Sequence, residues 1–126
     1  MPSKMEHLRK AEYNERFYES FDLATTQYLD WVVNGIFYSA LHYIESYLAT
    51  HNTHPPIHAI RNAEIRDDTN LGLYIFRRFN SLKDDSEDGR YRLKEFTPGE
   101  IQQHIIPKLY EIKEYLQKYI PEIRLA

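Results

Sequence analysis

The stretch DWVVNGIFYSALHYIESYLAT, residues 30–50, decides the fold that we expect for this chain. Apolar side chains occupy most positions around the helix that this stretch can form. A helix that is apolar on most of its sides is a central helix, contacted by several neighbours. The spacing predicts this helix over about residues 27–50, because Pro55 and Pro56 in the loop that follows cannot continue it.

One stripe of this predicted helix carries small or polar side chains in place of apolar ones. Its members recur at intervals of four, three and four residues: Gly35, Ser39, His42 and Ser46. Residues at these intervals share a helix face, and small side chains there let another helix approach closely. We therefore expect packing, either inside the fold or across a dimer. A nucleophilic Ser39–His42 pair is the alternative, although the sequence offers no third group to orient it.

Helical periodicity also governs the segments on either side. A capping box of Ser3 and Glu6 opens a first helix. A short third helix is expected over about residues 56–66, and a fourth over about 71–82, where apolar residues recur on one face. The charged segment KDDSEDG, residues 83–89, is expected to be a solvated loop.

The C-terminal part of the chain predicts one more helix. Thr97 and Glu100 make a second capping box, with proline at the first helical position. Pro107 should interrupt this helix, and Pro121 should end it. No segment alternates apolar and polar residues as a half-buried strand would. We therefore predict an all-α fold, a compact bundle of about five helices in a single domain spanning residues 1–126.

Composition excludes several classes of protein. The formal net charge of −3 gives no general attraction to nucleic acid, so any such binding would need a local basic patch. The absence of cysteine excludes disulfides, thiolate metal sites and thiol catalysis. No apolar run reaches the roughly 18 residues of a membrane span, and the charged start lacks the apolar core of a signal peptide. We expect a cytoplasmic protein.

Three histidines follow the central helix. His51, His54 and His58 are spaced by three and four residues, and on a continuous helix their imidazoles would share a face suited to zinc. Pro55 and Pro56 break that geometry. A polar loop that is rich in histidine is therefore the favoured interpretation, and we expect neither a metal nor a cofactor.

The segment HAIRN, residues 58–62, is the first candidate site. On a helix, His58, Arg61 and Asn62 lie within about one turn of one another. An imidazole, a permanent cation and an amide suit a phosphate group, and histidine can serve as a general acid or base near pH 7. The alternative is an exposed helix with ordinary polar residues. Arg90 and Tyr91 follow a run of acidic residues, so charge compensation accounts for Arg90 as well as a ligand does.

Three segments in this order resemble the HEPN superfamily, and more closely its small stand-alone bacterial and archaeal members. They are FYSALH at residues 37–42, HAIRN at 58–62 and GRY at 89–91, where the family usually has Ala-Arg-Tyr. The resemblance covers about residues 8–119. It implies a compact helical bundle, often a homodimer. Many members bind or cut RNA, frequently as toxins or defence ribonucleases, and others bind nucleotides or associate with a nucleotidyltransferase partner.

The chain departs from the ribonuclease members at one motif. Those members carry an arginine and then, after four to six residues, a histidine. After Arg61 the corresponding positions hold Arg66, Asp67 and Asp68. The absence of a general acid or base typically costs about 10²–10⁴ in rate. We therefore expect a domain that binds without cutting.

The sequence thus predicts a HEPN-like domain that binds RNA or a nucleotide, and the resemblance suggests a toxin–antitoxin or defence system. The expected ligand-binding residues are His58, Arg61, Asn62, Arg90, Tyr91 and His42. One alternative is a metal-independent ribonuclease in which His58 is the acid or base and Arg61 stabilises the phosphorane. Another is an adaptor whose tyrosine-rich faces bind a partner protein.

Overall fold

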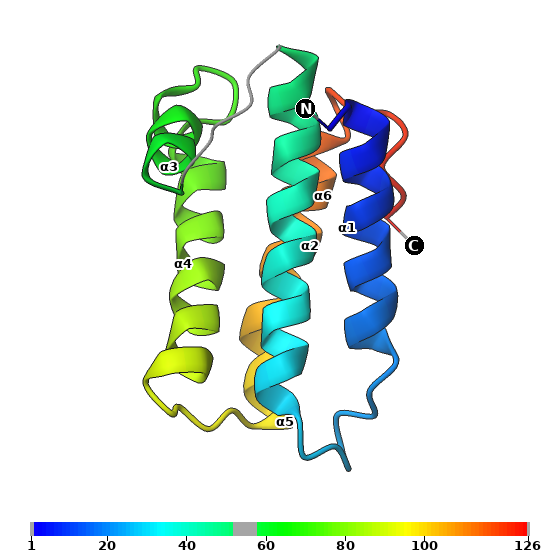
Figure 1. Cartoon of the computed structure of the whole chain (residues 1–126), viewed down its shortest axis with the longest axis vertical. Helices are drawn as coiled ribbons and strands as arrows, with labels where there is room; N and C mark the ends of the chain where they lie inside the picture. Colours follow the sequence, from blue (N-terminus) through cyan, green and yellow to red (C-terminus); the bar gives the residue numbers. More distant parts are fainter. Residues whose placement is uncertain (1, 52–57, 126) are drawn as a thin grey trace.

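The computed structural model describes residues 2–51 and 58–125, and all regular structure in these two ranges is helical (Figure 1). The helices are α1 (Lys4–Glu19), α2 (Leu29–Thr50), α3 (His58–Asp67), α4 (Gly72–Tyr91), α5 (Pro98–Glu100), the π-helical segment η1 (Ile101–Ile105) and α6 (Ile106–Leu116). Because α5, η1 and α6 follow one another directly, they form one interrupted helix. The predicted all-α bundle of about five helices is confirmed.

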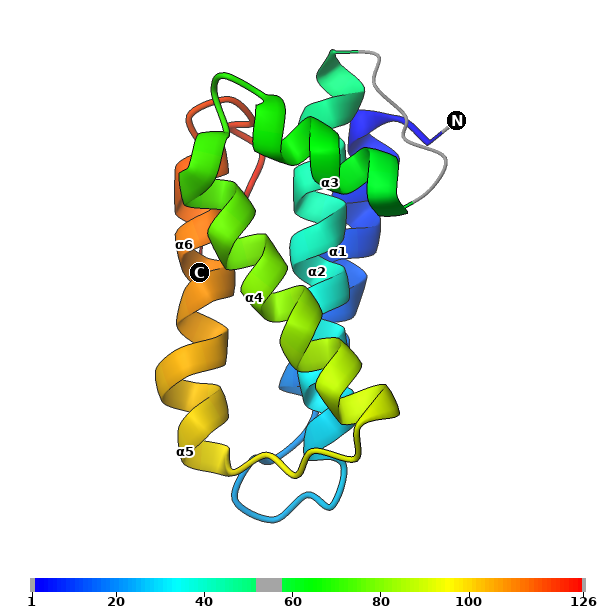
Figure 2. The same ribbon diagram turned by 90° about the vertical axis from the view of Figure 1, so that its left-hand side faces the viewer.

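The helix α2 is the central element. Figure 1 shows it upright between α1 and α4, with α6 behind it, and Figure 2 shows α4 slanting across the space between α2 and α6. The short helix α3 crosses the bundle at the end where the chain starts. Most of α2 is buried, as its apolar surface predicts, and residues such as Ile36, Ala40 and Ile44 are fully inaccessible.

One stripe of α2 remains accessible to solvent. Between Val32 and Leu48 every residue of the helix is buried except Tyr38, His42 and Glu45. Spacings of four and three residues place these side chains on one face, and Trp31 and Ala49 extend that face at its two ends. We call Trp31, Tyr38, His42, Glu45 and Ala49 the open stripe. From Trp31 to Glu45 it is about 21 Å long, at 1.5 Å per residue.

The small-residue stripe of α2 packs against α1 of the same chain. A methyl group added at Gly35 would lie 3.0 Å from side-chain atoms of both Phe17 and Tyr18, so only glycine permits this approach. The Ser39 hydroxyl donates a hydrogen bond to the carbonyl oxygen of Ala11 at 3.0 Å. The packing interpretation is correct in its intramolecular form. Because α1 covers this face at Gly35 and Ser39, packing inside the fold accounts for these two positions, whereas the dimer itself stays a prediction.

The predicted helix starts agree with the structure. The Ser3 hydroxyl accepts from the Glu6 amide at 3.2 Å, and the Glu6 carboxylate accepts from the Ser3 amide at 3.1 Å. The predicted second box forms only in part: the Thr97 hydroxyl accepts from the Glu100 amide at 3.1 Å, but the Glu100 carboxylate accepts from Lys94 at 2.9 Å. Both hydroxyls satisfy amide groups that have no partner inside a helix.

The prediction of a loop over residues 83–89 is wrong, because α4 continues through this segment to Tyr91. The Ser86 hydroxyl is fully buried and donates to the Asn34 side chain at 2.7 Å. On the outer face, Lys83 pairs with Glu87 one turn later at 3.2 Å. In this segment the charged residues therefore face solvent, and the side that faces the core carries the small residue Ser86. The high content of charged residues alone did not indicate a helix with two such sides.

Pro107 interrupts the last helix as predicted, and the interruption is the π-helical segment. The amide of Ile106 donates to the carbonyl of Ile101, five residues earlier. Proline lacks an amide hydrogen and its ring crowds the preceding turn. The hydrogen bonds just before Pro107 therefore change from the α-helical spacing of four residues to a spacing of five. None of the described helices combines the length and the apolar character needed to cross a bilayer.

Candidate functional site

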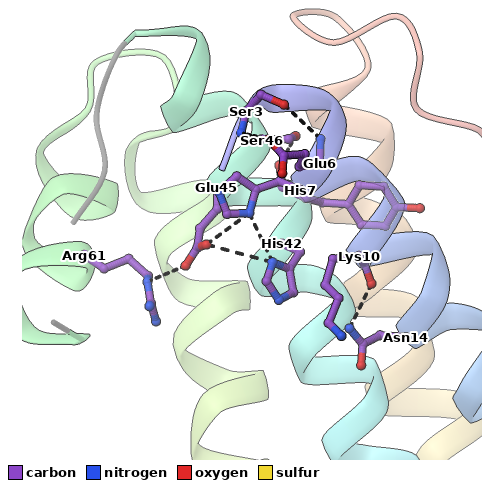
Figure 3. Close-up of polar contacts among 10 residues, drawn as sticks. Ser3, Glu6, His7, Lys10, Asn14, His42, Glu45, Ser46 and Arg61 are labelled. Carbon is purple, nitrogen blue, oxygen red and sulfur yellow. Dashed lines mark hydrogen bonds and ion pairs between the residues drawn. The ribbon is translucent and has the colours of Figure 1, made fainter. Parts of the chain in front are cut away.

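Four polar side chains from three helices meet at one end of the open stripe (Figure 3). His7 of α1 places its Nδ1 3.2 Å from Nδ1 of His42. The Glu45 Oε2 atom lies 3.3 Å from His7 Nδ1 and 3.9 Å from His42 Nδ1. The other oxygen of the same carboxylate, Oε1, forms an ion pair with Arg61 Nε of α3 at 2.9 Å. We call His7, His42, Glu45 and Arg61 the His–Glu–Arg cluster.

Local structure accounts for the position of each member. His42 and Glu45 are three residues apart on α2 and so project from the same face. The close approach of α1 to α2 at Ser39 brings the first turns of α1, and with them His7, against His42. The helix α3 crosses this end of the bundle, and Figure 3 shows Arg61 extending from it toward Glu45.

The cluster is largely shielded from water. Exposed side-chain fractions are 8% for His7, 11% for Arg61, 15% for Glu45 and 21% for His42. Burial lowers the pKa of His42 to about 4, and His7, Lys10 and Arg61 add to the effect in that order. At pH 7 the His42 imidazole is therefore neutral, and it acts as a hydrogen-bond acceptor, a donor or a metal ligand but not as a cation.

The predicted nucleophilic pair is not formed. The Ser39 side chain is fully buried, and its hydroxyl is directed to the Ala11 carbonyl. The hydroxyl of Ser46 donates to the Tyr43 carbonyl at 2.6 Å. Both hydroxyls thus stabilise local backbone structure, so the chemistry of the cluster rests on its imidazoles and its carboxylate.

Of the other two predicted residues of HAIRN, the structure describes the side chain of Asn62 but not that of His58. Asn62 lies in α3, and its Oδ1 atom is buried without a hydrogen-bond partner among the described residues. His58 begins α3, but its side chain, like His54, lies outside the described residues. The zinc hypothesis for the three successive histidines therefore stays a prediction. His51, the first of them, has its ring 4.8 Å from the ring of Tyr47.

Arg90 contacts another part of the open stripe, and Tyr91 lies beside Arg90. The Arg90 Nη1 donates to the Tyr38 hydroxyl at 3.3 Å, and its guanidinium carbon lies 4.9 Å from the Tyr91 ring centre. Tyr91 is 72% exposed and Trp31 is 53% exposed. Tyr38 precedes His42 by one helical turn. Arg90, which contacts Tyr38, and Arg61, which contacts Glu45, therefore approach the same stripe at neighbouring positions.

Sequence reasoning missed His7, Glu45, Tyr38 and Trp31. For three of them a signal existed, because Trp31, Tyr38 and Glu45 share the helical face of His42. His7 had no such signal, since only the packing of α1 on α2 brings it there.

Another polar group, between α1 and α6, has a structural explanation. Lys113 Nζ donates to Glu15 Oε2 at 2.8 Å, and the Tyr43 hydroxyl donates to Oε1 of the same carboxylate. Burial and the nearby carboxylate raise the pKa of Tyr43, which therefore stays protonated and keeps donating. A surface hollow lined in part by Glu12, Glu15 and Lys113 adjoins this group. Its buried charges are already paired with each other, so we place the candidate site at the open stripe.

Comparison of the chain with protein-family models, with curated proteins and with solved structures gave no match in any of the three. The resemblance to HEPN proteins therefore stays a prediction, and the functional argument rests on the geometry of the open stripe and the His–Glu–Arg cluster.

Proposed function

We propose that this chain is a HEPN-like domain that binds single-stranded RNA or a nucleotide along the open stripe of α2. One observation carries the proposal. The central helix is buried on every side except this stripe, and Arg61 and Arg90, both expected ligand-binding residues, approach it from two other helices. The part of the stripe from Trp31 to Glu45, about 21 Å long, accommodates a short ligand, which fits a chain without a general excess of positive charge.

The side chains along the stripe suit such a ligand. Trp31 and Tyr91 are exposed aromatic residues on which bases can stack, a contact typically worth about 1–3 kcal/mol per base. Arg90, beside Tyr38 and Tyr91, supplies a cation for a phosphate. Lys10 is exposed on α1, and Figure 3 shows it next to His42. Aromatic side chains thus occur both on the open stripe and on a helix beside it, and the cations occur on the helices beside it.

Binding without cleavage is the form that we propose. A general base works best with a pKa near the working pH, and His42, with a pKa of about 4, is too weak a base. Arg66 and Asp67, at two of the positions of the family's catalytic histidine, are exposed and pair with each other at 2.9 Å. The alternative, a metal-independent ribonuclease, would depend on His58 as the acid or base and Arg61 as the stabilising cation.

Binding is tested by fluorescence anisotropy with a labelled RNA octamer and with a labelled adenosine nucleotide. Arg90→Ala should weaken binding by about tenfold, a loss of roughly 1.4 kcal/mol. Arg77→Ala removes the same charge from an exposed position of the same helix and should have almost no effect. If Arg90→Ala and Arg61→Ala both bind like the wild type, the proposal is wrong.

A cleavage assay on the same RNA, with and without EDTA, distinguishes the ribonuclease alternative from binding without cleavage. Cleavage that resists EDTA and disappears in both His58→Ala and Arg61→Ala would establish the ribonuclease and exclude binding without cutting. Intact RNA after prolonged incubation with wild-type protein would exclude the ribonuclease and leave the binding proposal in place.

The resemblance also leads us to propose a cytoplasmic homodimer, with a role in a toxin–antitoxin or defence system and a possible nucleotidyltransferase-type partner. Exposed apolar side chains support a protein contact, and they include Tyr28, Trp31, Tyr91 and Leu93. Light scattering on the purified chain tests the dimer. If the chain binds no RNA or nucleotide but captures one protein partner, the adaptor alternative takes precedence.

A further inference from the structure

Three lone-pair atoms converge in the His–Glu–Arg cluster. They are His7 Nδ1, His42 Nδ1 and Glu45 Oε2, and they are separated by 3.2, 3.3 and 3.9 Å. Tetrahedral zinc has bonds of about 2.0–2.1 Å to histidine nitrogen and about 2.0–2.2 Å to carboxylate oxygen, so neighbouring ligand atoms lie roughly 3.3–3.5 Å apart. The three atoms therefore sit close to the corners of one face of such a tetrahedron.

We propose that His7, His42 and Glu45 form a zinc site, in which His7 Nδ1, His42 Nδ1 and Glu45 Oε2 bind the ion and a fourth position stays open. Two nitrogen ligands favour zinc over magnesium and calcium, which prefer oxygen. The proposal does not depend on the RNA or nucleotide function, because it rests on the convergence of these three atoms alone.

Burial and access also fit a metal ligand. The His7 residue is 6% exposed, so packing fixes its ring. The His42 side chain, at 21% exposed, gives the ion a path from solvent.

Arg61 supplies the outer contact that metal-binding carboxylates commonly have. Its ion pair uses Oε1 of Glu45 and leaves Oε2 directed at the two imidazoles. The guanidinium charge, together with nearby Lys10, opposes a second positive charge. The site also has only three protein ligands. For both reasons we expect zinc to bind more weakly than at a structural site with four protein ligands.

The experiment uses the whole chain without an affinity tag, stripped with EDTA and dialysed. Calorimetric titration with zinc chloride measures stoichiometry and affinity, and cobalt(II) replaces zinc for the visible bands of four-coordinate cobalt. We expect one equivalent of zinc per chain. His42→Gln and Glu45→Gln should each weaken binding at least tenfold, whereas His104→Ala removes an exposed imidazole and should leave binding unchanged.

Two further measurements keep the test decisive. His58→Ala should bind zinc like the wild type, and a loss confined to that variant would assign the metal to the successive histidines after α2 and overturn the proposal. Because a substitution of buried His7 can impair folding, wild-type imidazole ¹⁵N spectra are recorded with and without zinc. The Nδ1 signals of His7 and His42 should shift together. No zinc or cobalt binding by the folded wild type would also refute the proposal.

Discussion

Gly35→Ala tests the close contact between α1 and α2, which also brings His7 to His42. The added methyl group would lie 3.0 Å from Phe17 Cδ2, 3.0 Å from Tyr18 Cβ and 3.5 Å from Phe17 Cε2. Carbon atoms normally rest about 3.5–4.0 Å apart. The Phe17 ring can turn aside, but Tyr18 Cβ is fixed to the backbone, so α1 itself would have to move.

The magnitude follows from two opposing effects. Adding a methylene-sized group to a well-packed contact typically costs about 1–3 kcal/mol. Replacing glycine by alanine inside a helix stabilises the helix by roughly 0.8–1.0 kcal/mol, which offsets part of this cost. The difference runs from about 0 to 2 kcal/mol, so we expect Gly35→Ala to lower the free energy of unfolding by up to about 2 kcal/mol.

Urea unfolding followed by circular dichroism measures this change, and Gly99→Ala is the matched control. Gly99 is also helical, and nothing lies within 4 Å of an added methyl group there. The control should stabilise the chain by about 0.4–1 kcal/mol, because alanine reduces the freedom of the unfolded chain. If Gly35→Ala is as stabilising as Gly99→Ala, α1 does not approach α2 as closely as described.

Three further substitutions test two buried contacts and one left-handed backbone position, each by the same unfolding measurement. Lys113→Met should cost about 3–5 kcal/mol because it leaves the buried Glu15 carboxylate without its cation, and adding Glu15→Gln should restore part of the loss. Ser86→Ala should cost about 1–3 kcal/mol because it removes the partner of buried Asn34, and no loss would contradict that contact. Gly72→Ala should cost about 1–2 kcal/mol, since φ there is +56°, and a neutral result would argue against this left-handed backbone.

The fold was largely predictable because its signals are local. The apolar surface of α2, the capping box at Ser3 and the N-cap at Thr97 each act within a few residues. The C-terminal half of α4 was missed for the opposite reason. It is held by Ser86 against Asn34, 52 residues away, and no local pattern reveals such a bond.

The candidate site was predictable only in part. The sequence directed attention to His42 and Arg61, which the structure brings together through Glu45. Glu45 lies on the face of His42, but a glutamate on an otherwise apolar helix gives no sign of its partners. His7 is 35 residues from His42 in the chain, and the helix packing that joins them is a tertiary effect.

If both proposals are correct, zinc binding and RNA binding should each strengthen the other. Neither proposal requires this coupling by itself. Imidazoles that bind a metal are neutral, and the charges of Glu45 and Arg61 cancel, so bound zinc would give the cluster a net charge of +2 beside Lys10. A positive charge at one end of the open stripe attracts phosphate, so zinc should raise the affinity for the RNA octamer, and RNA should raise the affinity for zinc by the same factor. Anisotropy titrations with zinc and with EDTA measure this factor, for which about 5–20-fold corresponds to a coupling of roughly 1–2 kcal/mol. Glu45→Gln should abolish the zinc dependence. Equal RNA affinity with and without bound zinc would show that the ligand lies away from the cluster.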